Sequence, residues 1–307
     1  MNKLIYVIPM LDVDIVKGVR CIKKVLSAFN INGVSAEFLV IIQTNRSHCD
    51  ISELRFNENI EIMLTSDIGT SIARNRGIEY AIQMGFRFIG FLDAGILVSN
   101  NFGCALEKFL CKDSEEIFCG TLDWVNSADF NNISNDKLCE IQEVQLYQTY
   151  SSQVVRPLRD TYIGCFLFPV NVIKAFRFNP ALGPGQGNSL ESGEDVDFLF
   201  RVFGSKNFIL SYCDSACLYH EKRKGDSKRI VYAVGQGALY RFLVKQALFN
   251  GSYFMVIRVH ILFYFTLFCI NSIMMSLFNG QVGRDIFKRR FFGFFHKRFQ
   301  LFFTEEP

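Results

Sequence analysis

The sequence predicts an α/β fold built on a largely parallel sheet. Along its first third, short apolar runs alternate with amphipathic segments, which is the pattern of strands connected by helices. One run, residues 86–92, is apolar almost throughout, as expected of a strand that is buried on both faces. The chain has 307 residues, of which 50% are hydrophobic and 21% charged, so it can bury a large core, and disordered or collagen-like classes are excluded.

The individual elements follow from the same patterns. Strands are expected at residues 4–9, 37–42, 60–64, 86–92, 117–125, 163–168, 208–212 and 216–219. Helices are expected at residues 15–29, 70–84, 137–150, 194–203 and 228–249. No internal repeat or low-complexity linker interrupts the chain, so we expect one domain over residues 1–225 and a separate tail over residues 226–307.

Polar residues follow several of the predicted strands. In parallel sheets, ligands bind beyond the carboxyl ends of the strands, and Pro9 through Asp12, Gln43 and Asp93 fall at such ends. A carboxylate directly after a buried strand usually meets a cation, a cluster of donors or a ligand hydroxyl. Asp93 therefore has a functional interpretation, although an Asx-turn that ends at Gly95 explains it as well.

Two carboxylates, Glu194 and Asp195, follow a glycine-rich loop and open a predicted helix. The spacing from Ser192 to Asp195 is that of a capping box, and acidic residues are favoured at a helix N-terminus for structural reasons alone. The functional alternative makes one of the two a general base at a rigid helix start. The spacing by itself leaves both interpretations open.

Basic residues provide two further candidates. Arg74 and Arg76 lie in one turn of the predicted helix at 70–84, which fits either a solvated helix face or a diphosphate partner. His220 closes the last predicted strand and precedes a basic run. A histidine at that place is either structural or faces a phosphate or a metal.

The order of these motifs resembles the family 2 inverting glycosyltransferases of the GT-A fold. The chain carries an opening strand with Ile-Pro, then Ser-Ile-Ala-Arg-Asn-Arg-Gly-Ile, Phe-Leu-Asp, Ser-Gly-Glu-Asp-Val-Asp-Phe-Leu-Phe-Arg and finally Tyr-His. The resemblance covers about residues 3–225 and continues into the tail. It implies a nucleotide-binding half that is fused to an acceptor-binding half around a mixed central sheet.

The resemblance also implies a role for each matching residue. The nucleotide base would be bordered by the turn after the first strand and by the end of the second main strand, which supply Pro9, Met10, Asp12, Gln43 and Asn45. Arg74 and Asn75 would lie beside the nucleotide. Asp93 would stand for the first carboxylate of the family's Asp-x-Asp motif, and His220 would approach the diphosphate or its metal.

On the acceptor side, Asp195 would be the general base that deprotonates a sugar hydroxyl, with Glu194 helping to orient the acceptor. The resemblance implies Mg²⁺ or Mn²⁺ as the cation that neutralises the leaving diphosphate. Two departures bear on that cofactor. Asp-x-Asp is here Asp93-Ala94-Gly95, and the base-binding strand end has Gln43-Thr44-Asn45 where an aspartate is common. The metal is therefore held by other groups such as His220, or binding is independent of metal, or the enzyme is impaired.

The tail differs from the body in charge and composition. Residues 241–307 carry nine basic and three acidic residues, a net charge of +6, whereas the other 240 residues carry a net charge of −3. Residues 261–278 are apolar and 18 long, the short limit for a membrane span, and the residues after Gly280 interleave phenylalanine with arginine and lysine. Such a segment suits an anionic bilayer surface, and a re-entrant or in-plane helix, a true span and a buried helix stay open. Because the body is acidic and no RNA-binding module precedes the tail, nucleic acid is not expected as a partner.

Together these features predict a membrane-associated, inverting glycosyltransferase on the cytoplasmic face of the inner membrane, peripheral or re-entrant. The start of the chain shows no signal-peptide core, and the ten cysteines follow no framework spacing, which indicates free thiols in a reducing compartment. The expected donor is a UDP-sugar, and the expected acceptor is a glycan or lipid-linked oligosaccharide of a surface polysaccharide such as capsule or O-antigen. The alternatives are a catalytically impaired GT-A scaffold that binds nucleotide or a partner enzyme, and a membrane-surface protein with a merely structural body.

Overall fold

The structure is a computed structural model that describes residues 3–46, 49–112, 114–126, 130, 144–150, 162–185, 190–205, 207–221, 226–249 and 255–296. The chain divides into two compact units. The first, here called the sheet unit, comprises Met1–Tyr150, Tyr162–Arg177 and Phe208–Arg223. The second, here called the helical unit, comprises Ser151–Thr161, Phe178–Asn207 and Lys224–Pro307.

The first half of the sheet unit is a run of parallel strands. Their spatial order is β3 (Ile60–Thr65), β2 (Glu37–Gln43), β1 (Leu4–Leu11) and β4 (Phe88–Phe91). β1 and β2 are buried along almost their whole length because both faces of the sheet are covered. Since the strands are parallel, their carboxyl ends meet at one edge of the sheet, here called the site edge.

The second half of the sheet is mixed. After β4 come β8 (Phe166–Pro169), β6 (Ile117–Val125), β9 (Ile209–Glu221) and β5 (Ile96–Val98), and β7 (Tyr147–Tyr150) pairs with β9. β8 is antiparallel to both β4 and β6, whereas β6 and β9 are parallel. β6 and β9 therefore run in the same direction as β4, and they also end at the site edge.

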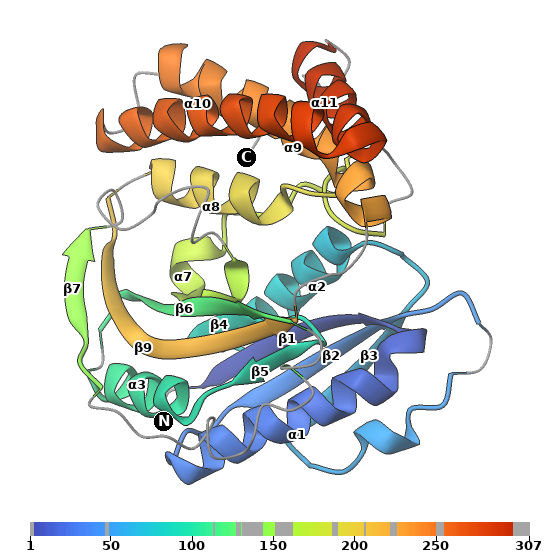
Figure 1. Cartoon of the computed structure of the whole chain (residues 1–307). Helices are drawn as coiled ribbons and strands as arrows, with labels where there is room; N and C mark the ends of the chain where they lie inside the picture. Colours follow the sequence, from blue (N-terminus) through green and yellow to red (C-terminus); the bar gives the residue numbers. More distant parts are fainter. Residues whose placement is uncertain are drawn as a thin grey trace. The chain divides into compact units, whose positions relative to one another are not determined.

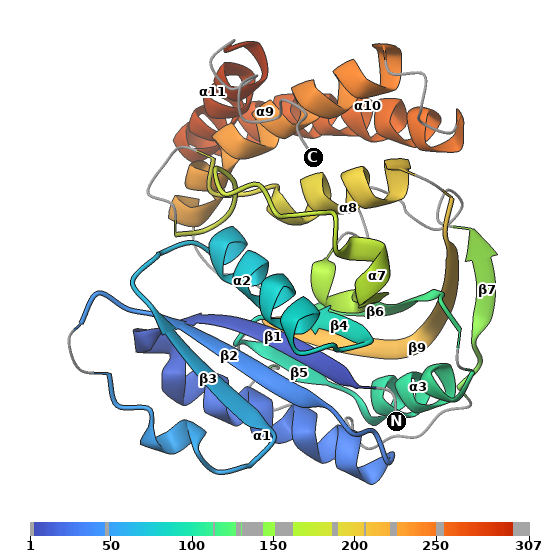
Figure 2. The same ribbon diagram turned by 180° about the vertical axis from the view of Figure 1, so that it is seen from behind.

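Helices cover both faces of this sheet (Figures 1 and 2). One face carries α1 (Ile15–Ile31) and α3 (Asn100–Cys111), and the other carries α2 (Thr70–Gln83) and α7 (Val170–Ile173). α1 packs through a buried apolar stripe, and Phe29 on that stripe contacts the rings of Tyr6 on β1 and Phe38 on β2. The α/β architecture predicted from the alternation of runs is confirmed.

Some predicted elements are wrong in detail. Residues 147–150 are a strand and not the end of a helix, because they pair with β9, and the rest of the predicted helix at 137–143 lies outside the described residues. The two strands predicted at 208–212 and 216–219 are one long strand, β9. Residues 163–165 form a 3₁₀ turn ahead of β8. The short strand β5 and the helix α3 were not expected.

The helical unit contains four described helices of eight residues or more: α8 (Glu194–Ser205), α9 (Asp226–Phe249), α10 (Met255–Phe278) and α11 (Gly280–Phe295). α9 and α11 cross at two glycines, since a Cβ on Gly237 would lie 2.0 Å from the carbonyl oxygen of Arg290, and one on Gly293 would lie 2.1 Å from that of Val234. Only glycine allows backbones to approach this closely. The compact helical unit therefore includes residues 178–207 together with the tail. The predicted division into a catalytic domain over residues 1–225 and a tail over residues 226–307 stays a prediction.

Candidate active site

Asp93 stands at the site edge, two residues after the end of β4, and its carboxylate lies near a guanidinium and an imidazole. Its Oδ1 lies 3.2 Å from Nη2 of Arg74, and its Oδ2 lies 3.7 Å from Nε2 of His220. The backbone N–H of Asp93 donates to the hydroxyl of Tyr162 at 3.2 Å. Three residues that the sequence marked separately, Asp93, Arg74 and His220, are therefore brought together by the fold.

Arg74 reaches Asp93 because α2 packs unusually close to β1. A Cβ on Gly77, one turn further along α2, would lie 2.5 Å from both Cγ atoms of Val7, and Ala73 is fully buried beside it. These small residues let the helix approach the sheet, so that Arg74 is buried to 2% exposure. A buried guanidinium needs an anionic partner, and Asp93 supplies it. Ala73 and Gly77 therefore allow the close packing of α2 on β1, and Arg74 between them uses it to reach Asp93.

His220 is positioned by two aromatic rings and by its own backbone. The ring of Trp124 at the end of β6 lies 4.6 Å from the imidazole centroid, and the ring of Tyr162 meets it edge-on at 5.9 Å. Nδ1 lies 2.8 Å from the carbonyl oxygen of Glu221. Because a carbonyl only accepts, Nδ1 carries the proton in this contact, and Nε2 is the nitrogen that faces Asp93.

Asp12 forms the second polar group of the site edge. Its Oδ2 accepts a hydrogen bond from the hydroxyl of Thr44 at 2.8 Å and lies 3.2 Å from Nε of Arg46. The backbone N–H of Arg46 in turn donates to the hydroxyl of Thr44. The loops after β1 and β2 are thereby joined through one carboxylate, and a charged guanidinium stands at the place where the sequence predicted a border for the nucleotide base.

The other residues predicted at the nucleotide base occupy different environments. Gln43 ends β2, is 4% exposed, and its side-chain oxygen accepts from the backbone N–H of Gly69 ahead of α2. Pro9 lies inside β1, not after it, and is buried. A proline is tolerated there because β4 pairs with β1 only as far as Val7. Asn45 is exposed.

Asn75 and Arg76 complete the predicted basic helix turn. Asn75 is half-buried next to Arg74. Arg76 forms an ion pair with Asp67, and both side chains are exposed. The two arginines of this turn therefore differ in kind, because Arg74 is a buried member of the Asp93 cluster and Arg76 belongs to the solvated face.

Glu194 and Asp195 form the first turn of α8 in the helical unit. The helix begins at Glu194, and the N–H of Asp197 donates to the carbonyl oxygen of Gly193, which makes Gly193 the residue before the helix. The hydroxyl of Ser192 donates to the carbonyl oxygen of Tyr232 on α9, so it does not act as the cap that a capping box requires. Glu194 is buried and Asp195 is partly exposed.

Asp197 is a third carboxylate in this turn, and it has a structural role. It is 2% exposed and pairs with Arg201 one turn further along α8, at 2.7 Å. Burial raises the pKa of Asp197, and the adjacent Arg201 opposes that shift. The carboxylate of Asp197 is buried and paired with Arg201, whereas Asp195 is partly exposed. Of these two aspartates, Asp195 is therefore the one more accessible as an acid or a base.

The residues at the site edge are a poor fit to a resident divalent cation. No group of three or more His, Cys, Asp or Glu side chains in the described ranges could hold a metal. Mg²⁺ and Mn²⁺ favour carboxylate oxygens, and position 95 offers a glycine where the resembled motif has a carboxylate. One oxygen of Asp93 is held by Arg74, which leaves its other oxygen and Nε2 of His220 as the candidate ligands.

Several residues of this cluster were not singled out from the sequence. Trp124 is the only tryptophan of the chain and ends a predicted strand, which are two signals that could have found it. Tyr162 precedes a predicted strand, so the rule that ligands gather at carboxyl ends missed it. Lys17 of α1 pairs with Glu221 beside His220, at 3.3 Å, and looks in the sequence like any exposed helix lysine.

No protein-family model and no curated protein matches the sequence. Solved structures do match the fold. The crystal structure of S. aureus TarS 1-349 in complex with UDP-GlcNAc matches with a TM-score of 0.51 and 13% identity, over 96% of this chain and 91% of that chain. The crystal structure of S. aureus TarS matches with a TM-score of 0.56 and 13% identity, over 86% of this chain and 43% of that chain. The TarS 1-349 complex with UDP matches with a TM-score of 0.50 and 14% identity, over 81% of this chain and 72% of that chain.

At this identity the matches concern the fold alone. They confirm the predicted fold class, which is an α/β fold with a mixed central sheet, similar to the GT-A domain of TarS and followed by C-terminal helices.

Proposed function

We propose that the protein is an inverting glycosyltransferase of the family 2 type that uses a nucleoside diphosphate sugar, specifically a UDP-sugar. The observation that carries this proposal is the cluster of Arg74, His220 and Asp93 at the site edge. It lies where ligands bind in α/β sheets. The similarity to TarS, which was crystallised with UDP and with UDP-GlcNAc, supports the choice of donor.

The nucleotide occupies the site edge in this proposal. Asp12, which directly follows β1, borders the base together with Gln43 and Asn45, and Asp93 faces the ribose and diphosphate. Arg74 positions the carboxylate of Asp93, and Asn75 lies beside the nucleotide. The charged and hydrogen-bonding groups around Asp12 support a polar ligand at this place.

Asp195 is the general base for the acceptor, and Glu194 orients the acceptor. The acceptor hydroxyl oxygen attacks the anomeric carbon while the bond from that carbon to the diphosphate oxygen breaks. Asp195 takes the hydroxyl proton, and the nucleoside diphosphate leaves with the bonding electrons. A single base is sufficient for one in-line displacement, which inverts the anomeric centre. The acceptor is a hydroxyl of a growing surface polysaccharide or of a lipid-linked oligosaccharide.

The test has two stages. Calorimetry with UDP, GDP, CDP and dTDP measures donor binding, and we expect UDP to bind most tightly. Asp195→Asn should then reduce transfer from the bound sugar nucleotide by about 100-fold or more without changing UDP affinity, whereas Glu191→Gln on the preceding loop should change neither. If Asp195→Asn leaves the rate unaltered, the protein is a nucleotide-binding scaffold in a polysaccharide assembly complex.

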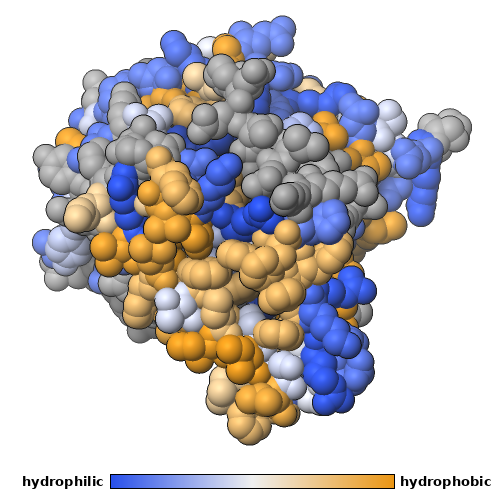
Figure 3. All heavy atoms as spheres, turned by 90° about the horizontal axis from the view of Figure 1, so that it is seen from above, coloured by the Kyte–Doolittle hydropathy of each residue, from blue (hydrophilic) through white to orange (hydrophobic). Residues whose placement is uncertain are grey.

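The tail places the enzyme on a membrane in this proposal. Arg258–Phe278 is long and apolar enough to cross a bilayer, yet only 17% of it is buried. Its outward face is mostly apolar along about 31 Å of helix, and Figure 3 shows a broad apolar area on the surface. The exposed apolar residues of α10 are Met255, Val259, Leu262, Phe263, Leu267, Ile270, Ile273, Met274, Leu277 and Phe278.

The side of α10 that faces α9 and α11 carries polar contacts as well as apolar ones, and Ser272 on it is buried. Arg290 of α11 donates to Asn271 and Ser272 of α10 and to Gln236 of α9, and its guanidinium lies 4.7 Å from the ring of Phe268. This arginine ties the three helices together along one side of α10. An in-plane helix keeps these contacts and buries the outward face in lipid, which favours it over a span.

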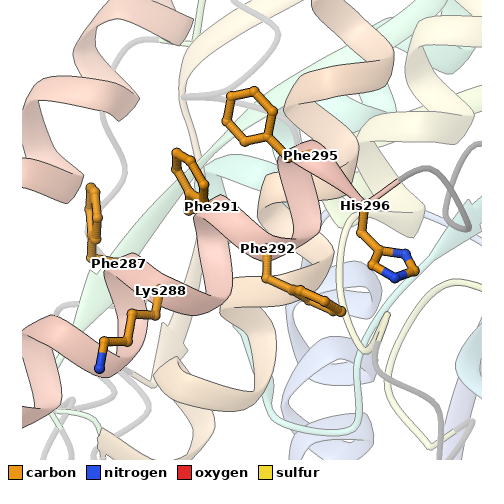
Figure 4. Close-up of a pocket in the computed structure, with 6 residues that line it drawn as sticks. All are labelled: Phe287, Lys288, Phe291, Phe292, Phe295 and His296. Atoms are coloured by element: carbon orange, nitrogen blue, oxygen red, sulfur yellow. The ribbon is translucent and has the colours of Figure 1, made fainter.

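Basic residues of α11 supply positive charge that complements an anionic bilayer, and aromatic residues lie among them. Arg284, Lys288 and Arg289 are exposed. Phe291 and Phe295 are also exposed, their rings are in contact at a centroid separation of 4.4 Å, and they line an open hollow (Figure 4). Each exposed lysine or arginine near an anionic surface contributes about 1 kcal/mol. A bilayer with anionic lipids at the cytoplasmic face is the expected partner.

Vesicle co-sedimentation tests the membrane proposal. The full chain should bind phosphatidylglycerol vesicles more strongly than phosphatidylcholine vesicles and should be released by an alkaline carbonate wash. Ile270→Glu, at the centre of the outward face, should abolish binding, whereas Ile31→Glu on α1 should not. Resistance to carbonate would indicate a true span, and equal binding by Ile270→Glu would contradict the proposal.

A further inference from the structure

The side chain of Lys17 occupies the place of a missing carboxylate. Position 95 follows Asp93-Ala94 and is a glycine. A Cβ built on Gly95 would lie 3.0 Å from both Cε and Nζ of Lys17. An ammonium group therefore stands where the side chain of residue 95 would begin.

Lys17 lies there because α1 packs closely against the loop after β4. A Cβ on Gly18 would lie 3.6 Å from Cβ of Ala94, an ordinary van der Waals contact, and 2.6 Å from Cε at the end of the flexible Met10 side chain, so the first turn of α1 lies directly beside this loop. The adjacent Lys17 is thereby set over Gly95. Its Nζ is held 3.3 Å from Oε2 of Glu221, the last residue of β9.

Lys17 is also accessible to a ligand. Its side chain is 48% exposed, against 2% for Arg74 and 6% for His220. Of these three side chains, Lys17 therefore has the largest exposed fraction. A lysine ammonium binds phosphate as a point charge, and the Glu221 contact limits the places that the ammonium visits.

The ammonium of Lys17 opposes a divalent cation at position 95. A metal there would gain no carboxylate from residue 95 and would be repelled by the ammonium of Lys17. The same ammonium would attract a diphosphate. The two groups that could share a metal, Asp93 and His220, are already within ion-pair distance of each other at 3.7 Å.

We propose that Lys17 neutralises the donor diphosphate in place of a divalent cation, so that nucleotide binding is independent of metal. The inference rests on the proposed function, because it names the group that meets the diphosphate in that site. When the bond between the anomeric carbon and the diphosphate oxygen breaks, negative charge develops on the leaving oxygen. Lys17 stabilises that charge electrostatically, and no proton is transferred to or from it.

Calorimetry of UDP binding to the full chain, in EDTA and in Mn²⁺, is the test. Wild-type affinity should differ by less than about 3-fold between the two conditions, since no metal takes part. Lys17→Met should weaken binding in EDTA by about 10–100-fold, the range for one charge-assisted contact. Lys23→Met, six residues further along α1 and directed at Phe56, is the matched control and should bind as the wild type does.

A second variant tests the exchange of lysine for metal. Gly95 is absent from the residues with positive φ, so an aspartate fits its backbone, and its side chain would meet only the flexible end of Lys17. The double substitution Lys17→Ala with Gly95→Asp should acquire Mn²⁺ dependence, with UDP binding at least about 10-fold tighter in Mn²⁺ than in EDTA.

The possible results distinguish failure of the Lys17 inference from failure of the proposed glycosyltransferase function. Loss of wild-type UDP binding in EDTA, unchanged binding by Lys17→Met, or a double variant indifferent to Mn²⁺ would each overturn the inference and leave the donor site standing. Absence of binding for all four nucleoside diphosphates by the wild type, with and without Mn²⁺, would overturn the proposed function itself.

Discussion

Replacing Arg74 with methionine removes the buried cation of the Asp93 cluster while keeping most of the apolar stem. At a separation of 3.2 Å between Nη2 and Oδ1, the attraction is about 5 kcal/mol at an effective dielectric constant of ~20. The Asp93 side chain is 25% exposed and regains some hydration when its partner is lost, which reduces the net cost to about 2–3 kcal/mol. We therefore expect Arg74→Met to lower the free energy of unfolding by that amount.

Urea unfolding, followed by fluorescence, measures the change, and UDP calorimetry on the same samples measures the effect on the site. The double variant Arg74→Met with Asp93→Asn removes both charges, so it should regain about 1–2 kcal/mol of stability relative to the sum of the single changes. It should not regain UDP binding, because Asp93 is needed there for the ligand. A single variant within about 0.5 kcal/mol of the wild type, or strictly additive effects, would refute the reasoning that this pair is coupled.

Three further changes probe the surroundings of the site. Gly77→Ala should lower the free energy of unfolding by about 1–3 kcal/mol, measured in urea, because the added methyl group overpacks against Val7. The double variant Gly77→Ala with Val7→Ala should lose less stability than the sum of the two single losses. Tyr162→Phe leaves the backbone N–H of Asp93 without its phenolic acceptor and should cost about 1 kcal/mol in the same measurement. Burial raises the pKa of Asp197, so the folded protein holds the proton of this carboxyl group more tightly than the unfolded chain does. The free energy of unfolding of the wild type, relative to that of Asp197→Asn, should therefore increase as the pH falls from 7 towards 4. A difference that does not change with pH would contradict this expectation.

Much of the candidate site could be found by one rule applied to the sequence. Asp93 and Gln43 follow or end buried strands, and parallel strands deliver such residues to one edge. The rule failed for Tyr162 because β8 is antiparallel to β4, which brings the start of a strand to the edge where the others end. Strand direction depends on pairing between distant segments, and no local pattern encodes it.

The sequence also left the choice between structural and functional interpretations open. The capping-box interpretation of Ser192 was settled by where α8 begins and by the contact between that hydroxyl and Tyr232 on α9. The pairing of Arg74 with Asp93 was settled by the packing of α2 on β1. In each case the deciding contact joins residues that are far apart along the chain, so periodicity and composition carry no information about it.

By itself, the sequence determined the alternation of strands and helices, the buried strands of the parallel half-sheet and the apolar, basic character of the tail. These properties follow from hydrophobic periodicity and charge, which act over a few neighbouring residues. Only the tertiary structure decided that the outward face of α10 is mostly apolar and that Lys17 fills the space over Gly95. The first depends on how α9, α10 and α11 pack together, and the second on the packing of α1 beside the loop after β4, and no local pattern in the sequence encodes either.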